Sequence, residues 1–132
     1  MSINFVPERA RVPICNYDLA RVSPEIDKTR RAVVVSPRSY NHRHGAGPGR
    51  CLVVPFSATR PFVLTPADVH FPAGKYRTLT VEPWAVCSAV MNASHSRLDR
   101  VYVGHRHYSE EVLSDEDMAR IEDGLKHAMG FP

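Results

Sequence analysis

The stretch that decides the fold is Lys28-Thr29-Arg30-Arg31-Ala32-Val33-Val34-Val35-Ser36, in which polar residues lead into a continuous valine run. A second apolar run, Cys51-Leu52-Val53-Val54-Pro55-Phe56, ends at Ser57 and Ala58. Short continuous runs of this composition are typical of buried strands, and strands that are neighbours in sequence usually pair. One predicted strand begins at a guanidinium and the other ends at a hydroxyl. The pair therefore predicts a site for a phosphodiester.

Shorter strand-like segments surround this pair. We expect a first strand over residues 12–19, in which Pro13 must lie at an edge or at the start. Turn residues and charges predict loops over residues 20–29 and 37–50. Further short strands are expected at residues 62–64, 68–71, 78–81, 86–90 and 100–103. Many short strands separated by turn residues are typical of a small barrel or sandwich.

The end of the chain has the pattern of a helix. Ser114 is followed three residues later by Asp117, which is the arrangement of an N-terminal cap. Apolar residues then recur at steps of three and four, at Met118, Ile121, Leu125 and Met129. Gly130 is placed to end the helix in the left-handed conformation. The fold class expected is mainly β, with one C-terminal amphipathic helix on a β core.

Length and composition limit the kind of protein. A chain of 132 residues can bury one good core, so we expect a single domain over residues 1–132. Cys15, Cys51 and Cys87 form no Cys-x-x-Cys pair and lie in apolar stretches, which predicts reduced core thiols. The chain has no apolar stretch long enough to cross a membrane and no signal-peptide pattern. These features predict a cytoplasmic protein that does not bind membranes.

The charges are segregated along the chain. Residues 110–132 contain seven acids and two bases, a net charge of −5, so the total of +3 leaves +8 on residues 1–109. Fourteen of the seventeen basic residues are arginine, whose planar fork matches a phosphate. A basic body of this kind attracts polyanions. A GC-rich genome explains the arginine bias equally well, but it does not explain the gathering of acids at one end.

The order of several motifs resembles that of the MazF/PemK (Kid) toxins over about residues 11–128. The motifs are Tyr17-Asp18-Leu19, Lys28-Thr29-Arg30, Val33-Val34-Val35-Ser36, Val54-Pro55-Phe56-Ser57, the segment 84–87, and Ser96-Arg97-Leu98-Asp99. The resemblance implies an SH3-like β-barrel with a C-terminal helix, usually a homodimer. It also implies cleavage of single-stranded RNA without metal or cofactor, and a cognate antitoxin protein as partner.

The resemblance assigns two catalytic residues. Arg30 matches the family's catalytic arginine, and Ser57 stands at its catalytic threonine. Arg31 replaces a proline of the family pattern, and Ala58 replaces a serine. Met91 stands where the family commonly has an arginine, and a thioether cannot donate a hydrogen bond to a phosphate. An alternative function is therefore a member that has lost cleavage and binds nucleic acid or protein, and a gyrase-directed toxin is a third.

Cleavage of RNA without metal requires three groups at the phosphate. The 2′-hydroxyl must lose its proton, the charge that develops on the phosphorane must be offset, and the departing 5′-oxygen must be protonated. Arg30 suits the second role, and Ser57 can bind the same phosphate by a hydrogen bond. Imidazole has the pKa for the proton transfers. The candidate proton carriers are His42, His44 and His95, and the candidate RNA-binding residues are Arg31, Arg38, Arg43 and Arg97.

Three further features have two interpretations each. The pairs His42-x-His44 and His105-x-His107 resemble halves of a metal site, but acidic or cysteine partners do not accompany them, and an exposed loop and a strand face are the simpler interpretation. We therefore predict no metal site. Trp84 and Phe56 can stack on bases, although burial in the core or a dimer interface is the commoner fate of aromatic side chains.

Overall fold

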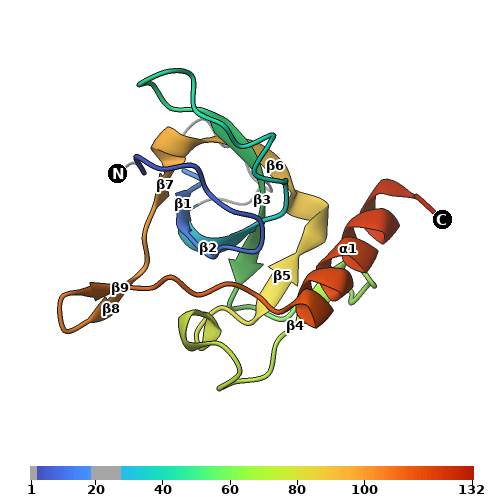
Figure 1. Ribbon diagram of the computed structural model, residues 1–132. Coiled ribbons are helices and arrows are strands. Elements are labelled where there is room, and N and C mark those ends of the chain that lie inside the picture. The colour runs from blue at the N-terminus through green and yellow to red at the C-terminus, as the bar shows by residue number, and fades with distance from the viewer. Residues whose placement is uncertain (1–2, 19–27) are drawn as a thin grey trace.

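The computed structural model describes residues 3–18 and 28–132, and its main feature is an antiparallel sheet with one long helix beside it (Figure 1). The sheet consists of β1 (Ile14–Asn16), β2 (Thr29–Val34), β3 (Arg50–Ser57), β4 (Asp68–His70), β5 (Trp84–Val86), β6 (Met91–Ser94) and β7 (Leu98–Asp99). The hairpin of β8 (Tyr102–Gly104) and β9 (His107–Tyr108) follows, and then helix α1 (Asp115–Met129). Three short 3-10 helices, Arg77–Leu79, Cys87–Ala89 and His95–Arg97, connect the strands.

The strands lie in the order β4-β5-β3-β2-β1-β7, and β6 pairs with the remaining part of β3. The predicted pairing of the two valine runs is confirmed, with Val33 opposite Val54 and Ala32 opposite Pro55. Within the described residues β4 and β7 do not pair with each other, so the sheet is open rather than a closed barrel. The expected β core with a C-terminal helix is present.

The two faces of β2 and β3 bury separate core clusters. Alternation along a strand sends neighbouring side chains to opposite faces. Val33 and Phe56 therefore pack in a cluster with Met118 and Ile121 of α1. Ala32 and Val34 point the other way, into a second cluster, whose remaining members are Ile3, Cys15, Tyr17, Cys51, Val53, Ala93 and Leu98. Both faces are buried, which explains why these strands read as continuous apolar runs.

Several strand boundaries differ from the prediction. The expected strand at residues 62–64 is wrong: this segment lies in the loop between β3 and β4, and Phe62 is fully exposed. The expected strand at residues 78–81 is also wrong, because Arg77–Leu79 form a 3-10 helix whose buried Thr78 donates through its backbone N–H and its hydroxyl to Glu111. At Thr78 a tertiary contact overrides the local pattern, whereas the exposed residues 62–64 pair with no strand among the described residues.

The remaining differences are shifts of a few residues. The strand expected over residues 86–90 is β5, which ends at Val86 before a 3-10 helix, and that expected over 100–103 is β8. Most of the loop expected over residues 20–29, and Leu19 at the end of the first strand, lie outside the described residues. The loop after β2 is held by Asn41, which is fully buried and donates to the carbonyls of Pro7 and Ser36.

Helix α1 begins and ends as its sequence predicts. The Ser114 hydroxyl accepts from the backbone N–H of Asp117, and Gly130 adopts a φ of 76° after the last turn. Arg120 on the helix donates to the carbonyl of His70, which fixes the helix against β4 (Figure 1). No helix among the described residues is long and apolar enough to span a membrane.

Candidate functional site

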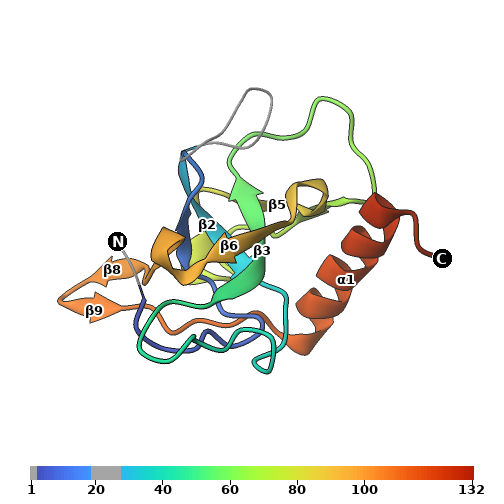
Figure 2. The same cartoon turned by 90° about the horizontal axis from the view of Figure 1, so that it is seen from above.

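Arg30 and Ser57 lie at the same end of the β2–β3 pair and on the same face. β2 begins next to Arg30 and the antiparallel β3 ends at Ser57, so the two residues share one end of the sheet (Figure 2). Arg30 is two residues from Ala32 on β2, and Ser57 is four residues from Val53 on β3, so each side chain points to the same face as that neighbour. Ala32 and Val53 both belong to the second cluster. Both side chains are half-buried. The two predicted catalytic residues are thus brought to the rim of one core cluster.

The ladder between β2 and β3 ends just before these residues. The last pair toward this end is Ala32 with Pro55, and beyond it the backbone N–H of Arg31 donates to Glu82 at 3.2 Å. The guanidinium of Arg31 also lies 3.7 Å from the Glu82 carboxylate. Alternation turns Arg31 to the face opposite Arg30. Arg31 is therefore held in a structural ion pair and does not share a face with the predicted catalytic pair.

Ser57 stands in a row of side chains that crosses three strands. It pairs with Trp84 of β5, and Trp84 pairs with His70 of β4. The indole and imidazole rings are 4.6 Å apart between centroids, with an interplanar angle of 50°. Trp84 is half-buried and His70 is exposed, so both rings remain accessible. An aromatic pair therefore lies one strand away from the predicted catalytic hydroxyl.

Ser57 is held so that its hydroxyl keeps a hydrogen to donate. Its Oγ accepts from the backbone N–H of Thr59 at 3.2 Å. A serine hydroxyl both accepts and donates, so this turn orients the oxygen and leaves its hydrogen for another acceptor. A phosphate oxygen is an acceptor of that kind.

Arg97 reaches the same end of the sheet from the other side. Its Nη1 donates to the carbonyl of Asn16 at 2.9 Å, and Asn16 pairs with Thr29 at the start of β2. Arg97 is half-buried and lies one residue before β7. Two arginines from distant parts of the sequence, Arg30 and Arg97, therefore lie around the beginning of β2.

The basic loop before β3 lies at the opposite end of the hairpin. β3 contains eight residues, which span about 23 Å at the ordinary rise of a strand, and the loop joins its first residue whereas Ser57 is its last. Figure 2 shows this loop at the start of β3, away from the arrowhead. His42 and His44 lie in it with their rings 5.6 Å apart. Closeness in sequence to Arg30 therefore does not make them neighbours of the site.

The two arginines of this loop have other contacts. Arg43 donates to the carbonyls of Ile3 and Ala46, and so fixes the N-terminal segment against the loop. Arg38 is 3.6 Å from the carboxylate of Glu8, and both side chains are largely exposed. Neither residue lies at the Arg30 end of the sheet. The exposed charge of Arg38 contributes to long-range attraction of anions rather than to a local site.

His95 is a buried structural residue. It has no exposed surface, and its Nδ1 accepts from the backbone N–H of Gly49 at 3.1 Å. Burial lowers the pKa of His95, and the charge of Arg43 lowers it further. The imidazole is therefore neutral near pH 7 and shielded from any molecule at the surface. This placement argues against the hypothesis that it carries a proton for the reaction.

Met91 packs on the same face as the site but farther along β3. It lies opposite Val53 and packs against the second cluster, half-buried. Val53 and Ser57 are four residues apart on one strand, which corresponds to about 13 Å. The thioether therefore occupies an apolar position toward the middle of the sheet. An arginine there would have to reach along β3 to approach Ser57.

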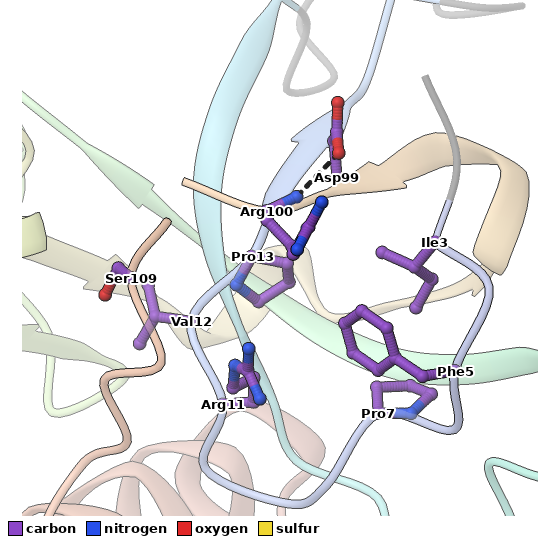
Figure 3. A pocket seen from close by; sticks show the side chains of 9 residues that line it. All are labelled: Ile3, Phe5, Pro7, Arg11, Val12, Pro13, Asp99, Arg100 and Ser109. Carbon is purple, nitrogen blue, oxygen red and sulfur yellow. Dashed lines mark hydrogen bonds between the residues drawn. The ribbon is translucent and has the colours of Figure 1, made fainter. Parts of the chain in front are cut away.

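A small hollow elsewhere on the molecule is lined mainly by apolar side chains (Figure 3). Its lining residues are Ile3, Phe5, Pro7, Arg11, Val12, Pro13, Asp99, Arg100 and Ser109. The guanidinium of Arg11 covers the ring of Phe5 at 5.4 Å from its centroid. Asp99 pairs with Ile14, at the end of β1 opposite to Asn16. The hollow is therefore separate from the Arg30 end of the sheet.

The arrangement can hold a phosphate and a base side by side. Arg30 and Arg97 supply positive charge, Ser57 supplies a hydroxyl, and the tilted pair of Trp84 and His70 supplies ring faces on which a base can stack. Sequence reasoning missed His70 and Glu82, because neither stands in a motif and both reach this end only through the order of the strands. Within the described residues, no three side chains of His, Cys, Asp or Glu gather as metal ligands.

The fold is that of solved MazF toxins. The structure of MazF (Form-I) from Deinococcus radiodurans matches with a TM-score of 0.69 and 20% identity, covering 96% of this chain and 99% of that chain. An endoribonuclease in complex with its cognate antitoxin, from a mycobacterial species, matches with a TM-score of 0.64 and 17% identity over 96% and 97% of the two chains. A MazE–MazF complex (Form-II) from D. radiodurans matches with a TM-score of 0.63 and 18% identity, over 97% and 99%.

The sequence itself assigns the family. Residues 8–129 match the PemK-like, MazF-like toxins of type II toxin–antitoxin systems. No curated protein sequence matches the chain. Because the family match covers most of the 132 residues, the chain belongs to this toxin family.

Proposed function

We propose that this protein is a toxin endoribonuclease, a single domain over residues 1–132 that cleaves single-stranded RNA at the Arg30–Ser57 end of its sheet. The observation that carries the proposal is the placement of Arg30 and Ser57 on one face and at one end, although they are 27 positions apart in the sequence. Arg97 approaches the same end. Membership in the toxin family supports the assignment.

The reaction is an attack of the 2′-oxygen on the adjacent phosphorus. A base takes the proton of the 2′-hydroxyl, a bond forms between the 2′-oxygen and phosphorus, the bond from phosphorus to the 5′-oxygen breaks, and the 5′-oxygen takes up a proton. The products end in a 2′,3′-cyclic phosphate and a 5′-hydroxyl. Arg30 offsets the charge that grows on the non-bridging oxygens, and the Ser57 hydroxyl donates to one of them. The step is an intramolecular transfer of the phosphorus from one oxygen to another, so it consumes no water.

Among the titratable side chains near this end of the sheet, His70 is the proposed proton carrier, in place of the three histidines named from the sequence. His70 stands in the row of Ser57 and Trp84, whereas Glu82 is paired with Arg31 on the face opposite Arg30. His42 and His44 are about 23 Å of strand away, and His95 is buried. Of the four arginines named as RNA ligands, we assign local contact with RNA to Arg97 alone.

The proposal includes a partner and a location. A cognate antitoxin neutralises the toxin, as complexes of similar fold from mycobacteria and D. radiodurans support. Two copies form a homodimer, and the exposed apolar side chains of Phe62, Val63 and Leu64 are a surface that a second chain can cover. The protein acts in the cytoplasm, where RNA is available and where its three free cysteines stay reduced.

The test is incubation of the purified protein with single-stranded RNA in EDTA. We expect cleavage products that end in a 2′,3′-cyclic phosphate. Arg30→Ala should remove the cleavage, and Ser57→Ala should reduce it by roughly 10²-fold, as loss of one donor to a transition-state oxyanion does. Arg38→Ala is the matched control, because it removes an equal charge at the far end of the same strands and should leave the cut positions unchanged.

Three results would contradict the proposal. Intact RNA under these conditions, with harmless expression in cells, indicates a member that binds without cleaving. Intact RNA together with inhibited DNA supercoiling indicates a toxin directed at gyrase. If the Arg30→Ala variant still cleaves RNA, the protein is an endoribonuclease but its active site lies in another part of the chain.

A further inference from the structure

We propose that His70 and Trp84 form a stacking platform for one base of the RNA, next to the phosphate held by Arg30 and Ser57. This inference rests on the proposed function and adds to it the residues that contact a base. It concerns the surface of β4 and β5, where the proposed proton carrier His70 also lies. The platform would hold a base beside the cut and thereby contribute to the choice of cleavage position.

The two rings face away from the core that supports them. Val69, Ala85 and Phe56 form a cross-strand row that is buried in the helix-side cluster. His70 and Trp84 alternate with that row, so their side chains lie on the opposite face of β4 and β5. Trp84 belongs to neither core cluster. Its ring therefore remains available at the surface, whereas most large aromatic side chains are buried.

The distances suit one nucleotide. Neighbouring strands lie about 4.8 Å apart, so Trp84 is one strand from Ser57, and His70 is one strand farther. A phosphate bound by Ser57 would thus have an aromatic surface directly at its side. Stacking on such a surface tolerates any base, because every base has a π-face. Positive charge comes from the other side, where Arg30 and Arg97 lie.

The platform is held in place before RNA binds. Arg120 of α1 donates to the carbonyl of His70 at 2.6 Å, and its guanidinium covers the ring of Phe71 at 5.1 Å. The backbone N–H of Phe71 donates to the carbonyl of Pro83, immediately before Trp84. Both ring-bearing residues are therefore tied to their neighbours through the backbone. A preformed surface loses less conformational freedom when a ligand binds.

The chain offers a direct probe of this site, because Trp84 is its single tryptophan. A 2′-O-methyl oligonucleotide cannot be cleaved, since its 2′-oxygen is blocked, and it can be titrated against the whole protein in EDTA. We expect saturable quenching of Trp84 fluorescence that coincides with binding measured by anisotropy of the labelled oligonucleotide. An oligonucleotide with one abasic position should bind with the platform empty and quench less.

Variants separate the base contact from the phosphate contact. Trp84→Ala should weaken binding by about 5- to 150-fold, which is the range for one stacked base, with no change in the salt dependence. Arg30→Ala should weaken binding and also lower the salt dependence, because it removes a phosphate contact. Trp84→Phe should bind within a few-fold of the wild type, and it controls for misfolding of the alanine variant.

His70 has a control that separates stacking from proton transfer. His70→Phe keeps a ring and should keep the affinity, whereas His70→Ala should lose part of it. Loss of cleavage with unchanged affinity in His70→Phe would assign proton transfer to His70 in addition to the platform. The platform is wrong if the oligonucleotide binds without altering Trp84 fluorescence, or if Trp84→Ala binds and cleaves as the wild type does. A wild type that neither binds nor cleaves would instead refute the proposed function.

Discussion

The buried carboxylate of Asp117 should stabilise the fold by an amount that depends on pH. It accepts from the Tyr76 hydroxyl at 2.6 Å and forms ion pairs with Lys75 at 2.9 Å and Arg120 at 3.1 Å. Its side chain is 1% exposed, whereas the two cationic side chains are 40% and 41% exposed. Asp117→Asn removes the charge at nearly constant volume and also turns an amide donor toward groups that themselves donate.

The magnitude follows from these contacts. The hydrogen bond from Tyr76 to a charged acceptor contributes about 1.5–3 kcal/mol. The ion pair with Arg120 adds less than about 1 kcal/mol, because its guanidinium is partly solvated. We therefore expect Asp117→Asn to lower the free energy of unfolding by about 2–3 kcal/mol, which corresponds to a fall of about 10 °C in Tm for a chain of this length. Asp123→Asn is the control, since that acid is exposed on the same helix.

The pH dependence has a definite sign. Burial by itself would raise the pKa of Asp117, but the hydrogen bonds from Tyr76, Lys75 and Arg120 outweigh it and hold the pKa below its usual value. A lowered pKa stabilises the fold above the unfolded-state pKa of about 3.9, and this contribution is lost as the pH falls toward the folded-state value. The difference between wild type and Asp117→Asn should therefore be full above about pH 5 and shrink below about pH 4.

Urea unfolding at pH 7, 5 and 3, followed by Trp84 fluorescence and circular dichroism, measures this difference. Two outcomes would refute the reasoning: a loss no larger than that of Asp123→Asn at pH 7, or a loss that stays constant with pH. The variant should also weaken binding of the 2′-O-methyl oligonucleotide, because Asp117 holds Arg120, and Arg120 holds the backbone of His70.

Three further predictions follow from buried groups. Gly124→Ala should lower the free energy of unfolding by about 1–2 kcal/mol, because the added Cβ would lie 2.7 Å from Cys87 Sγ. The cost of this overpacking exceeds the gain from the higher helix propensity of alanine. A variant that is more stable than the wild type in urea unfolding would contradict this prediction. Burial raises the pKa of the Cys51 and Cys87 thiols to about 12, so a thiol reagent at pH 8 should label neither before unfolding, and rapid native-state labelling would show that the core is open. Burial lowers the pKa of His95, so the neutral imidazole stabilises the fold fully above the unfolded-state pKa of about 6.5, and this stabilisation is lost as the pH falls. Between pH 7 and pH 5 the free energy of unfolding should therefore fall less for His95→Gln than for the wild type. Equal falls in the two proteins would contradict this prediction.

Local patterns predicted the elements whose signals lie within a few residues. The valine run around Val33 and the run around Val54 became paired strands, since both of their faces are buried. The cap at Ser114 and the glycine at Gly130 set the ends of the helix. Isolated apolar triplets were a weaker signal, and Phe62 to Leu64 lies exposed in a loop because no neighbouring strand pairs with it in the described residues.

The sequence by itself determined the two strands, the helix and the family, and it singled out Arg30 and Ser57 as the proposed catalytic pair. Only the tertiary structure decided which groups surround that pair. Strand alternation turned Arg31 away to Glu82, and the antiparallel order β4-β5-β3 brought His70 and Trp84 beside Ser57. Because the histidine-rich loop joins the first residue of β3 and Ser57 is its last, the length of this strand separates the loop from Ser57. Secondary-structure propensity and helix capping depend on residues that are near neighbours in the chain. The pairing of strands depends instead on which apolar faces are buried together, and these faces come from distant parts of the sequence.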